Sequence, residues 1–169
     1  TKARRSLGIG FIGLAHYLAK LGFKYESQEA WDAVHGLAES FQFYLLKASN
    51  KLAQEKGHCS NFGRTKYADG ILPIDTYKKD VDEITTQEYQ HDWESLRASI
   101  LETGLRHSTL SAQMPSESSS VVSNATNGIE PPRGFLSIKK SKKGPLKQVV
   151  PSYTTLKNNY TLLWDMPDN

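Results

Sequence analysis

A run of small hydroxyl residues has the clearest chemical potential in this sequence of 169 residues. Residues 115–120 read Pro-Ser-Glu-Ser-Ser-Ser, and two valines follow. Ser116 or Ser118 can cap a short helix that runs into residues 121–123. The first turn of a helix presents N–H groups without intrahelical partners, and the helix dipole adds partial positive charge there. With serine hydroxyls as further donors, the segment is suited to bind phosphate; the alternative is an ordinary capped, serine-rich turn.

Other residues that could do chemistry are isolated along the chain. Cys59 is the single cysteine, so it has no intrachain disulfide partner and no second thiol for a metal site, which fits a reducing cytosol. His58 precedes it, but sequence neighbours rarely adopt the geometry of a Cys–His nucleophile, and we expect Cys59 to be a bystander. His35 lies in a helical pattern without Glu or His at metal-ligand spacing, and we expect a packed side chain rather than a metal ligand.

Residues 8–13, Gly-Ile-Gly-Phe-Ile-Gly, match the pattern G-x-G-x-x-G. A dinucleotide fingerprint requires a strand before this pattern and a helix opening after it. Residues 1–6 do not read as a buried strand. We therefore predict a buried helix whose glycines allow close approach to another backbone, and a dinucleotide-binding domain is the alternative. The residues at helical spacing are Leu7, Phe11, Leu14, Ala15 and Leu18.

The elements that must position the serine-rich segment follow from hydrophobic periodicity. An amphipathic stripe over residues 93–101 predicts a helix with Asp92 as its cap and Gly104 just past its end. Leu105–Ser111 has strand character, and Pro115 then stops the strand because it offers no N–H to a sheet. The order strand, loop, helix start is where α/β folds collect ligands.

The remaining chain predicts further helices and one hairpin. A long helix begins at its cap, Ser27, and ends at Gly57, and residues 57–74 are irregular. Residues 75–91 are polar and acidic, which predicts an exposed helix and a connection. The apolar face predicted for the long helix consists of Trp31, Val34, Leu37, Ala38, Phe41, Leu45, Ala48 and Leu52.

Phe135–Ile138 and Leu146–Val150 are predicted to be the strands of the hairpin. We expect its lysine-rich tip, residues 139–143, to be solvated rather than bound to nucleic acid. A last helix is predicted from Ser152 to Pro167. Its core-facing residues are Tyr153, Leu156, Tyr160, Leu163 and Trp164.

The chain length indicates one globular domain, or a piece of one. The alternation of helices with short strands predicts an α/β architecture. Hydrophobic residues make up 38% and charged residues 23%, and the net charge of +3 is too small to favour nucleic acid as a partner. No apolar run reaches the roughly 18 residues of a membrane span, so we expect a cytoplasmic protein without a membrane partner. The first residue is Thr1 rather than Met, which is typical of a processed, cropped or split chain.

Several motifs resemble the signature of the large (alpha) subunit of class I ribonucleotide reductase, most closely the ribonucleoside-diphosphate reductase of enteric bacteria and their phages. The resemblance spans essentially all of the chain and covers only part of the much longer family chain. The main motifs are Trp93-Glu-Ser-Leu-Arg-Ala-Ser-Ile100, Gly104-Leu-Arg-His-Ser-Thr-Leu110 and Met114-Pro-Ser-Glu117, with further matches at residues 4–10, 44–50, 70–79 and 124–134.

The resemblance implies that residues 1–169 are a single segment of the family's ten-stranded α/β barrel domain. It implies reduction of ribonucleoside diphosphates to deoxyribonucleoside diphosphates for DNA synthesis. The family uses a cysteine thiyl radical, a redox-active cysteine pair, an assisting Asn and Glu, and a tyrosine pair that relays the radical. None of these positions matches this stretch, so we expect no catalytic residue, no metal site and no activity of the isolated chain.

In that family a PSESS-type loop holds the substrate diphosphate, which assigns substrate binding to Pro115, Ser116, Glu117, Ser118 and Ser119. Because a carboxylate repels phosphate, we assign Glu117 a role through its backbone N–H. The resemblance also implies that this chain binds no cofactor: the radical cofactor resides in the small subunit, and nucleotide effectors bind elsewhere on the large subunit. Expected partners are the remainder of the large subunit, the small subunit and the substrate. The alternative is a non-catalytic phosphate-binding or subunit-assembly fragment.

Overall fold

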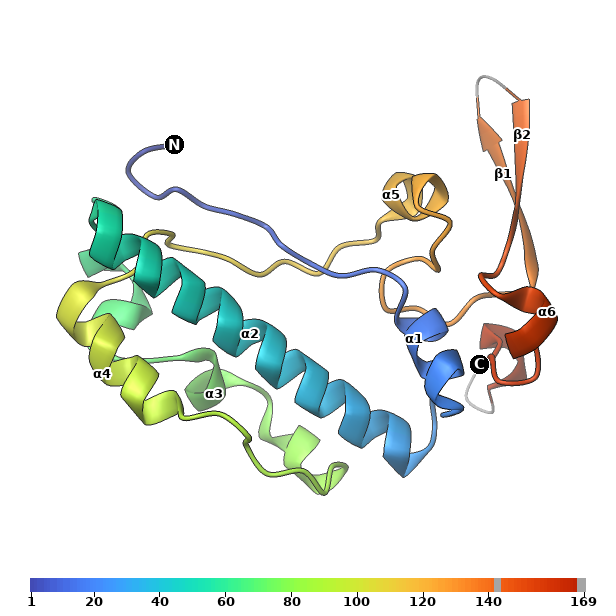
Figure 1. Ribbon diagram of the computed structural model, residues 1–169, viewed down its shortest axis with the longest axis horizontal. Coiled ribbons are helices and arrows are strands. Elements are labelled where there is room, and N and C mark those ends of the chain that lie inside the picture. The colour runs from blue at the N-terminus through green and yellow to red at the C-terminus, as the bar shows by residue number, and fades with distance from the viewer. Residues whose placement is uncertain (142–143, 167–169) are drawn as a thin grey trace. The chain divides into compact units, whose positions relative to one another are not determined.

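The computed structural model describes residues 1–141 and 144–166, and the chain forms two compact units. The first unit comprises residues 1–9 and 32–112. The second comprises residues 10–31 and the chain from Gln113 onward. Figure 1 shows the elements of both, and each unit is described by itself below.

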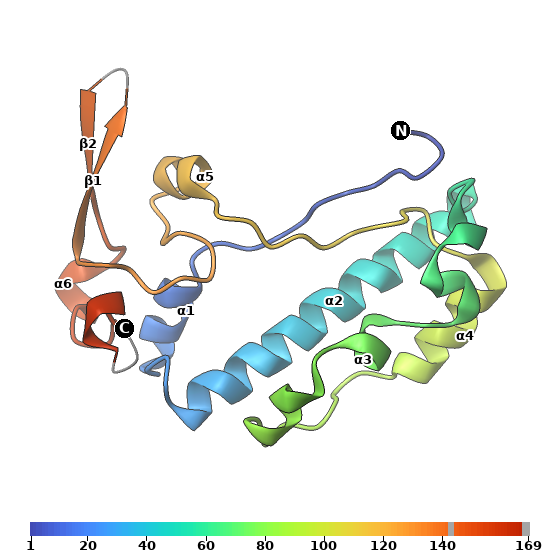
Figure 2. The same ribbon diagram turned by 180° about the vertical axis from the view of Figure 1, so that it is seen from behind.

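Two helices dominate the first unit. The long helix α2 (Gln28–Lys56) has both predicted ends: Ser27 Oγ accepts the Ala30 N–H at 3.2 Å, and Gly57 follows in the left-handed conformation at φ 79°. Helix α4 (Trp93–Thr103) runs beside α2 (Figures 1 and 2). The Asp92 carboxylate caps α4 by accepting the Ser95 N–H at 3.0 Å, as predicted.

The core of the first unit lies between α2 and α4. Its buried members are Phe43, Leu46, Leu72, Trp93, Leu96, Ile100, Leu105 and Leu110. The apolar face predicted for α2 is wrong, because Leu45 is only partly buried and Ala48 is exposed. The face that is buried also carries the polar side chains of Glu39 and Asn50.

Those two buried polar side chains explain why periodicity failed. Glu39 accepts the Trp93 indole N–H at 3.0 Å and also the backbone N–H groups of Gln90 and His91. Asn50 Nδ2 donates to Thr103 Oγ1 at 2.8 Å and to the Gly104 carbonyl at 2.9 Å. A buried polar group that is hydrogen-bonded can face a core, and a hydrophobicity pattern does not detect it.

The chain between α2 and α4 is mostly irregular, as predicted for residues 57–74. It contains helix α3 (Pro73–Thr76) and short 3-10 turns at Phe62–Arg64, Lys66–Asp69 and Lys79–Glu83. The exposed helix predicted over residues 75–91 is reduced to part of α3 and the last of these turns. The Thr85 hydroxyl and the N–H and hydroxyl of Thr86 instead donate to the Asp32 carboxylate on α2. These hydrogen bonds take the place of those that a helix would form within itself.

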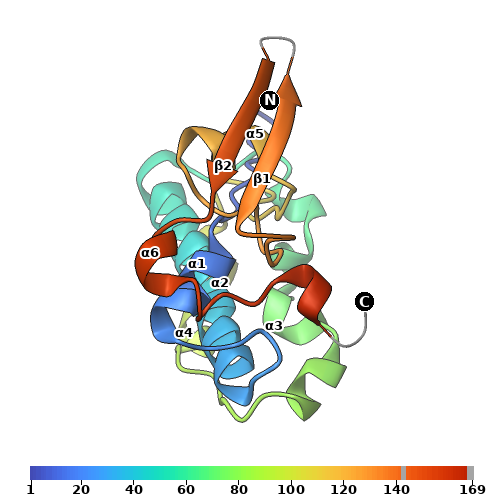
Figure 3. The same ribbon diagram turned by 90° about the vertical axis from the view of Figure 1, so that its right-hand side faces the viewer.

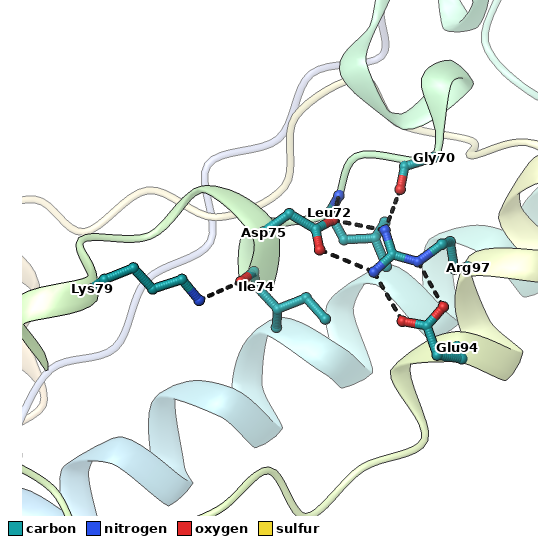
Figure 4. A network of polar contacts seen from close by, with 7 residues as sticks. All are labelled: Gly70, Leu72, Ile74, Asp75, Lys79, Glu94 and Arg97. Atoms are coloured by element: carbon teal, nitrogen blue, oxygen red, sulfur yellow. Dashed lines mark hydrogen bonds and ion pairs between the residues drawn. The ribbon is translucent and has the colours of Figure 1, made fainter. Parts of the chain in front are cut away.

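Arg97 on α4 fixes the loop that leads into α3 (Figure 4). Its guanidinium donates to both Asp75 oxygens, at 2.7 and 3.0 Å, to both Glu94 oxygens, each at 3.0 Å, and to the Gly70 carbonyl. Paired hydrogen bonds of this kind are strong and directional. The hydrogen bond from Arg97, followed by one from the Leu72 N–H, lowers the pKa of the Asp75 carboxyl.

The strand predicted over Leu105–Ser111 is wrong as a regular strand. Its regular pairing with the preceding chain is limited to one isolated parallel bridge, between Ile9 and Ser111. Other backbone donors of the segment go to irregular partners, since the Arg106 N–H bonds the Ser49 carbonyl and the Ser108 N–H bonds the Arg4 carbonyl. Without a partner strand along its length, the segment is extended but forms no ladder.

In the second unit, helix α1 (Leu14–Leu21) begins later than predicted. Gly13 is left-handed at φ 83°, and the N–H groups of Gly13 and Leu14 bond the carbonyls of Thr126 and Gly128. These contacts keep residues 8–13 out of the helix, so the buried helix predicted there is wrong in its first half. An extended stretch, a turn and a helix do follow one another, but the extended part forms an isolated bridge at Ile9 and no strand of a parallel sheet.

The predicted hairpin is confirmed. Strands β1 (Leu136–Ser141) and β2 (Gly144–Val149) pair antiparallel from Leu136 opposite Val149 to Ser141 opposite Gly144 (Figure 3). Lys142 and Lys143 of the predicted tip lie outside the described residues. Helix α5 (Glu117–Val122) precedes the hairpin, and helix α6 (Tyr153–Leu156) follows it.

The long last helix is a wrong prediction, since α6 has four residues and only a 3-10 turn, Leu163–Asp165, comes later. Hydrogen bonds with α1 and with the turn after it hold this end of the chain in a non-helical path. Asn159 Nδ2 donates to the Ala19 carbonyl at the end of α1, and Lys24 donates to the Tyr160 carbonyl. Pro167, the predicted stop, lies outside the described residues. A small core unites Ala15, Ala19, Val150 and Tyr160.

Candidate anion-binding site

The five predicted substrate-binding residues gather at the start of α5. Ser116 occupies the N-cap position, and Glu117 to Ser119 form the first turn. The predicted helix start is therefore confirmed, with Ser116 rather than Ser118 as the first flanking residue. Ser116 is half-buried, whereas Pro115, Glu117, Ser118 and Ser119 are exposed.

Two exposed residues in the first turn of α5 present donors without acceptors. In the part of the chain that the structure describes, the backbone N–H groups and the hydroxyls of Ser118 and Ser119 have no hydrogen-bond partner. The helical ladder begins one residue later, where the Ser120 N–H donates to the Ser116 carbonyl at 2.8 Å. Ser116 does not cap with its side chain, because its hydroxyl donates to the Met114 carbonyl at 3.2 Å.

Two side-chain amides hold α5 at its ends. Asn127 Oδ1 accepts the Ser116 N–H at 2.9 Å, and Asn127 Nδ2 donates to Glu130 Oε2 at 3.4 Å. Gln148 Nε2, on β2, donates to the Ser120 carbonyl at 3.3 Å and to the Ala125 carbonyl at 3.1 Å. Sequence reasoning assigned neither residue a role.

Only one of the two amides left a signal in the sequence. Asn127 stands before Gly128, and Asn-Gly is a strong turn signal that could have drawn attention to a side chain folded back on its own backbone. Gln148 reads as an ordinary strand residue. Its contact with α5 depends on the register of the hairpin, in which it lies opposite Ser137.

A cavity of about 300 Å³ lies beside α5 within the second unit. Glu117 and Ser120 line it from the helix, and Thr126 lines it from the following turn. Thr126 is 6% exposed, and its hydroxyl has no hydrogen-bond partner among the described residues. The cavity therefore borders the side of α5 that carries Glu117 and Ser120.

The other chemically suggestive residues form no site in the described part of the chain. Cys59 is buried, and the His58 ring bonds the Cys59 carbonyl at 2.8 Å rather than the thiol, so no Cys–His pair is formed. His35 stacks on Tyr89 with ring centroids 6.2 Å apart. Within residues 1–141 and 144–166, no cluster of three His, Cys, Asp or Glu side chains is arranged to hold a metal ion. Over the same residues, no helix combines the length and apolar character required to cross a bilayer.

Sequence comparison defines the class to which this chain belongs. The family described as "Ribonucleotide reductase, barrel domain" matches residues 1–165. The chain therefore belongs to the ribonucleotide reductase family and is a part of its α/β barrel domain, as the resemblance implied.

Individual relatives sharpen the assignment. The chain is 62% identical over 167 residues to the "Ribonucleoside-diphosphate reductase subunit alpha" of Haemophilus influenzae. It is 60% identical over 166 residues to the "Ribonucleoside-diphosphate reductase 1 subunit alpha" of Escherichia coli, and 47% identical over 165 residues to the subunit alpha of Enterobacteria phage T4. These matches cover 98–99% of this chain but only 22% of each relative. The chain thus spans about a fifth of the length of the curated relatives it matches.

Proposed function

We propose that this chain is part of the large subunit of a ribonucleoside-diphosphate reductase and that its residues 115–119 bind the diphosphate of the substrate. The enzyme would reduce ribonucleoside diphosphates to deoxyribonucleoside diphosphates for DNA synthesis. The names of the relatives support the reaction. The donors of Ser118 and Ser119, which have no partner among the described residues, are the observation that supports the binding role.

The chemistry of the loop suits a diphosphate. Phosphate oxygens accept hydrogen bonds from backbone N–H groups and hydroxyls, and the first turn of α5 offers both kinds of donor. No lysine or arginine occurs in residues 113–132, so charge would be met by these donors and by the helix dipole. Glu117 contributes through its backbone N–H, since its carboxylate would repel the phosphate.

In this proposal the chain binds the substrate but does not supply the catalytic groups. The family chemistry requires several thiols, and this chain has only Cys59, which is buried. The thiyl radical and the reducing cysteine pair would come from the remainder of the large subunit, and the radical would originate in the small subunit. The isolated chain would then show only background reduction of a ribonucleoside diphosphate.

The test requires a completed large subunit, defined here as this chain joined to the flanking segments of the Haemophilus influenzae relative. Each hydrogen bond to a charged acceptor contributes about 1.5–3 kcal/mol, so Ser118→Ala and Ser119→Ala should each weaken substrate binding about 10- to 100-fold. Val122→Ala is the matched control, because Val122 is on the same helix and 89% exposed. Unchanged affinity in correctly folded Ser118→Ala and Ser119→Ala variants would contradict the proposal.

A further inference from the structure

We propose that Asn127 is a positioning residue for the diphosphate loop: by accepting the Ser116 N–H, it sets the orientation of the first turn of α5 toward the ligand. The proposal rests on the function proposed above and extends it to a residue outside residues 115–119. It follows from how α5 is held, from what lies beside it, and from the chemistry of the amide group.

Helix α5 has no fully buried apolar side chain. It has six residues, all of them described, and the buried one is Ser120, a polar residue that is 0% exposed. Val122, which could have packed into a core, is 89% exposed. Because burial of apolar surface is what usually fixes a helix on a domain, the position of α5 must depend on hydrogen bonds.

The cavity beside α5 makes that dependence stronger. Glu117 and Ser120 line a cavity of about 300 Å³. A helix that borders such a space has fewer packing contacts to oppose a shift on that side. The hydrogen bonds from Asn127 and Gln148 are then the restraints on the two ends of α5.

The backbone on either side of Asn127 is itself fixed. The Thr126 carbonyl accepts the Gly13 N–H at 3.0 Å, and the Gly128 carbonyl accepts the Leu14 N–H at 3.3 Å. The start of α1 therefore holds the turn from which Asn127 reaches Ser116. A group that binds a ligand is oriented best when its own supports are locked in this way.

The two partners of Asn127 require an amide. The Ser116 N–H needs an acceptor, which is Oδ1, and the Glu130 carboxylate needs a donor, which is Nδ2. An aspartate would keep the acceptor for Ser116, but it would face the Glu130 carboxylate and add negative charge beside the bound diphosphate. An alanine would remove both hydrogen bonds without adding charge.

These differences define the experiment, which is substrate binding by the completed large subunit at low and high ionic strength. Asn127→Ala should raise the dissociation constant for a ribonucleoside diphosphate about 10-fold relative to the unsubstituted protein at every ionic strength. Asn127→Asp should raise it more at low salt, and that excess should shrink at high salt because screening weakens charge repulsion. Asn158→Ala, an exposed amide in the same unit, should leave the constant unchanged.

The salt-dependent excess in Asn127→Asp would show that residue 127 lies close to the bound diphosphate, and this variant keeps the acceptor that Ser116 needs for folding. The inference is overturned if both Asn127 variants bind as the unsubstituted protein does while Ser118→Ala and Ser119→Ala bind weakly. In that case the proposed diphosphate site stands without Asn127. If the serine variants also bind normally, the proposed function itself fails and this inference fails with it.

Discussion

Helices α4 and α5 are held in place by different physical means. Helix α4 buries Trp93, Leu96 and Ile100 in the core of its unit. Helix α5 buries only Ser120 and is held at its ends by two side-chain amides. The comparison separates a helix that is packed into a core from one whose position depends on hydrogen bonds, as a helix with the proposed binding role would.

The two ways of holding a helix predict different free energies for opening α4 and α5. Apolar burial resists displacement through many contacts, so α4 should open only when its whole unit unfolds. A helix restrained by a few hydrogen bonds can open locally, and binding segments are often drawn from such regions of low stability. Substitutions in α4 should therefore change stability, whereas substitutions around α5 should change ligand binding.

The largest effect is expected in the core of the first unit. Leu96→Ala should lower the free energy of unfolding by about 2–5 kcal/mol, because it leaves a cavity among buried side chains. Leu101→Ala is the control on the same helix, since Leu101 is 51% exposed and should change the free energy by only about 0.5 kcal/mol. Urea unfolding of this chain measures both. Similar losses in the two variants would show that α4 is not anchored as described.

A smaller effect is expected when α5 loses one of its restraints. Gln148→Ala removes the donor to the Ser120 and Ala125 carbonyls, and a typical hydrogen bond contributes about 1 kcal/mol. Amide hydrogen exchange should become faster across α5 and stay unchanged in α4. Exchange in α5 that is unaffected by the substitution would mean that other contacts hold the helix.

The smallest effect concerns the partly exposed ion pair of Arg97 and Asp75. Its hydrogen bonds lower the pKa of Asp75 in the folded state, so the stabilisation is present above the unfolded pKa of about 3.9 and is lost as pH falls through the lower folded pKa. Asp75→Asn should reduce stability near pH 6, and the difference from the unsubstituted chain should vanish in acid. Asp80→Asn is the control, because its partner Lys78 is highly exposed and such pairs contribute little. A difference that persists at low pH would contradict this assignment.

Local signals predicted several elements well. Ser27, Asp92 and Gly104 mark helix ends whose capping depends on adjacent residues, and the hairpin followed from alternation around Gly144. The family was recognisable because its motifs are contiguous, and the start of α5 followed from proline and serine at residues 115 and 116.

Features that depend on distant partners were not predictable. The buried face of α2 is set by Glu39 and Asn50, whose partners Trp93 and Gly104 each lie 54 positions further along the chain. Residues 8–13 are kept out of a helix by carbonyls of Thr126 and Gly128. The roles of Asn127 and Gln148 likewise arise from tertiary contacts, which no pattern in the local sequence encodes.

The central claim is that the first turn of α5 holds the diphosphate of the substrate. The most direct measurement compares the affinities of the completed large subunit for a ribonucleoside diphosphate and for the matching ribonucleoside, with and without Ser118→Ala and Ser119→Ala combined. The account predicts at least a 10-fold loss of diphosphate affinity in the double variant, with ribonucleoside affinity unchanged. An equal change for both ligands, or no change for the diphosphate, would contradict it.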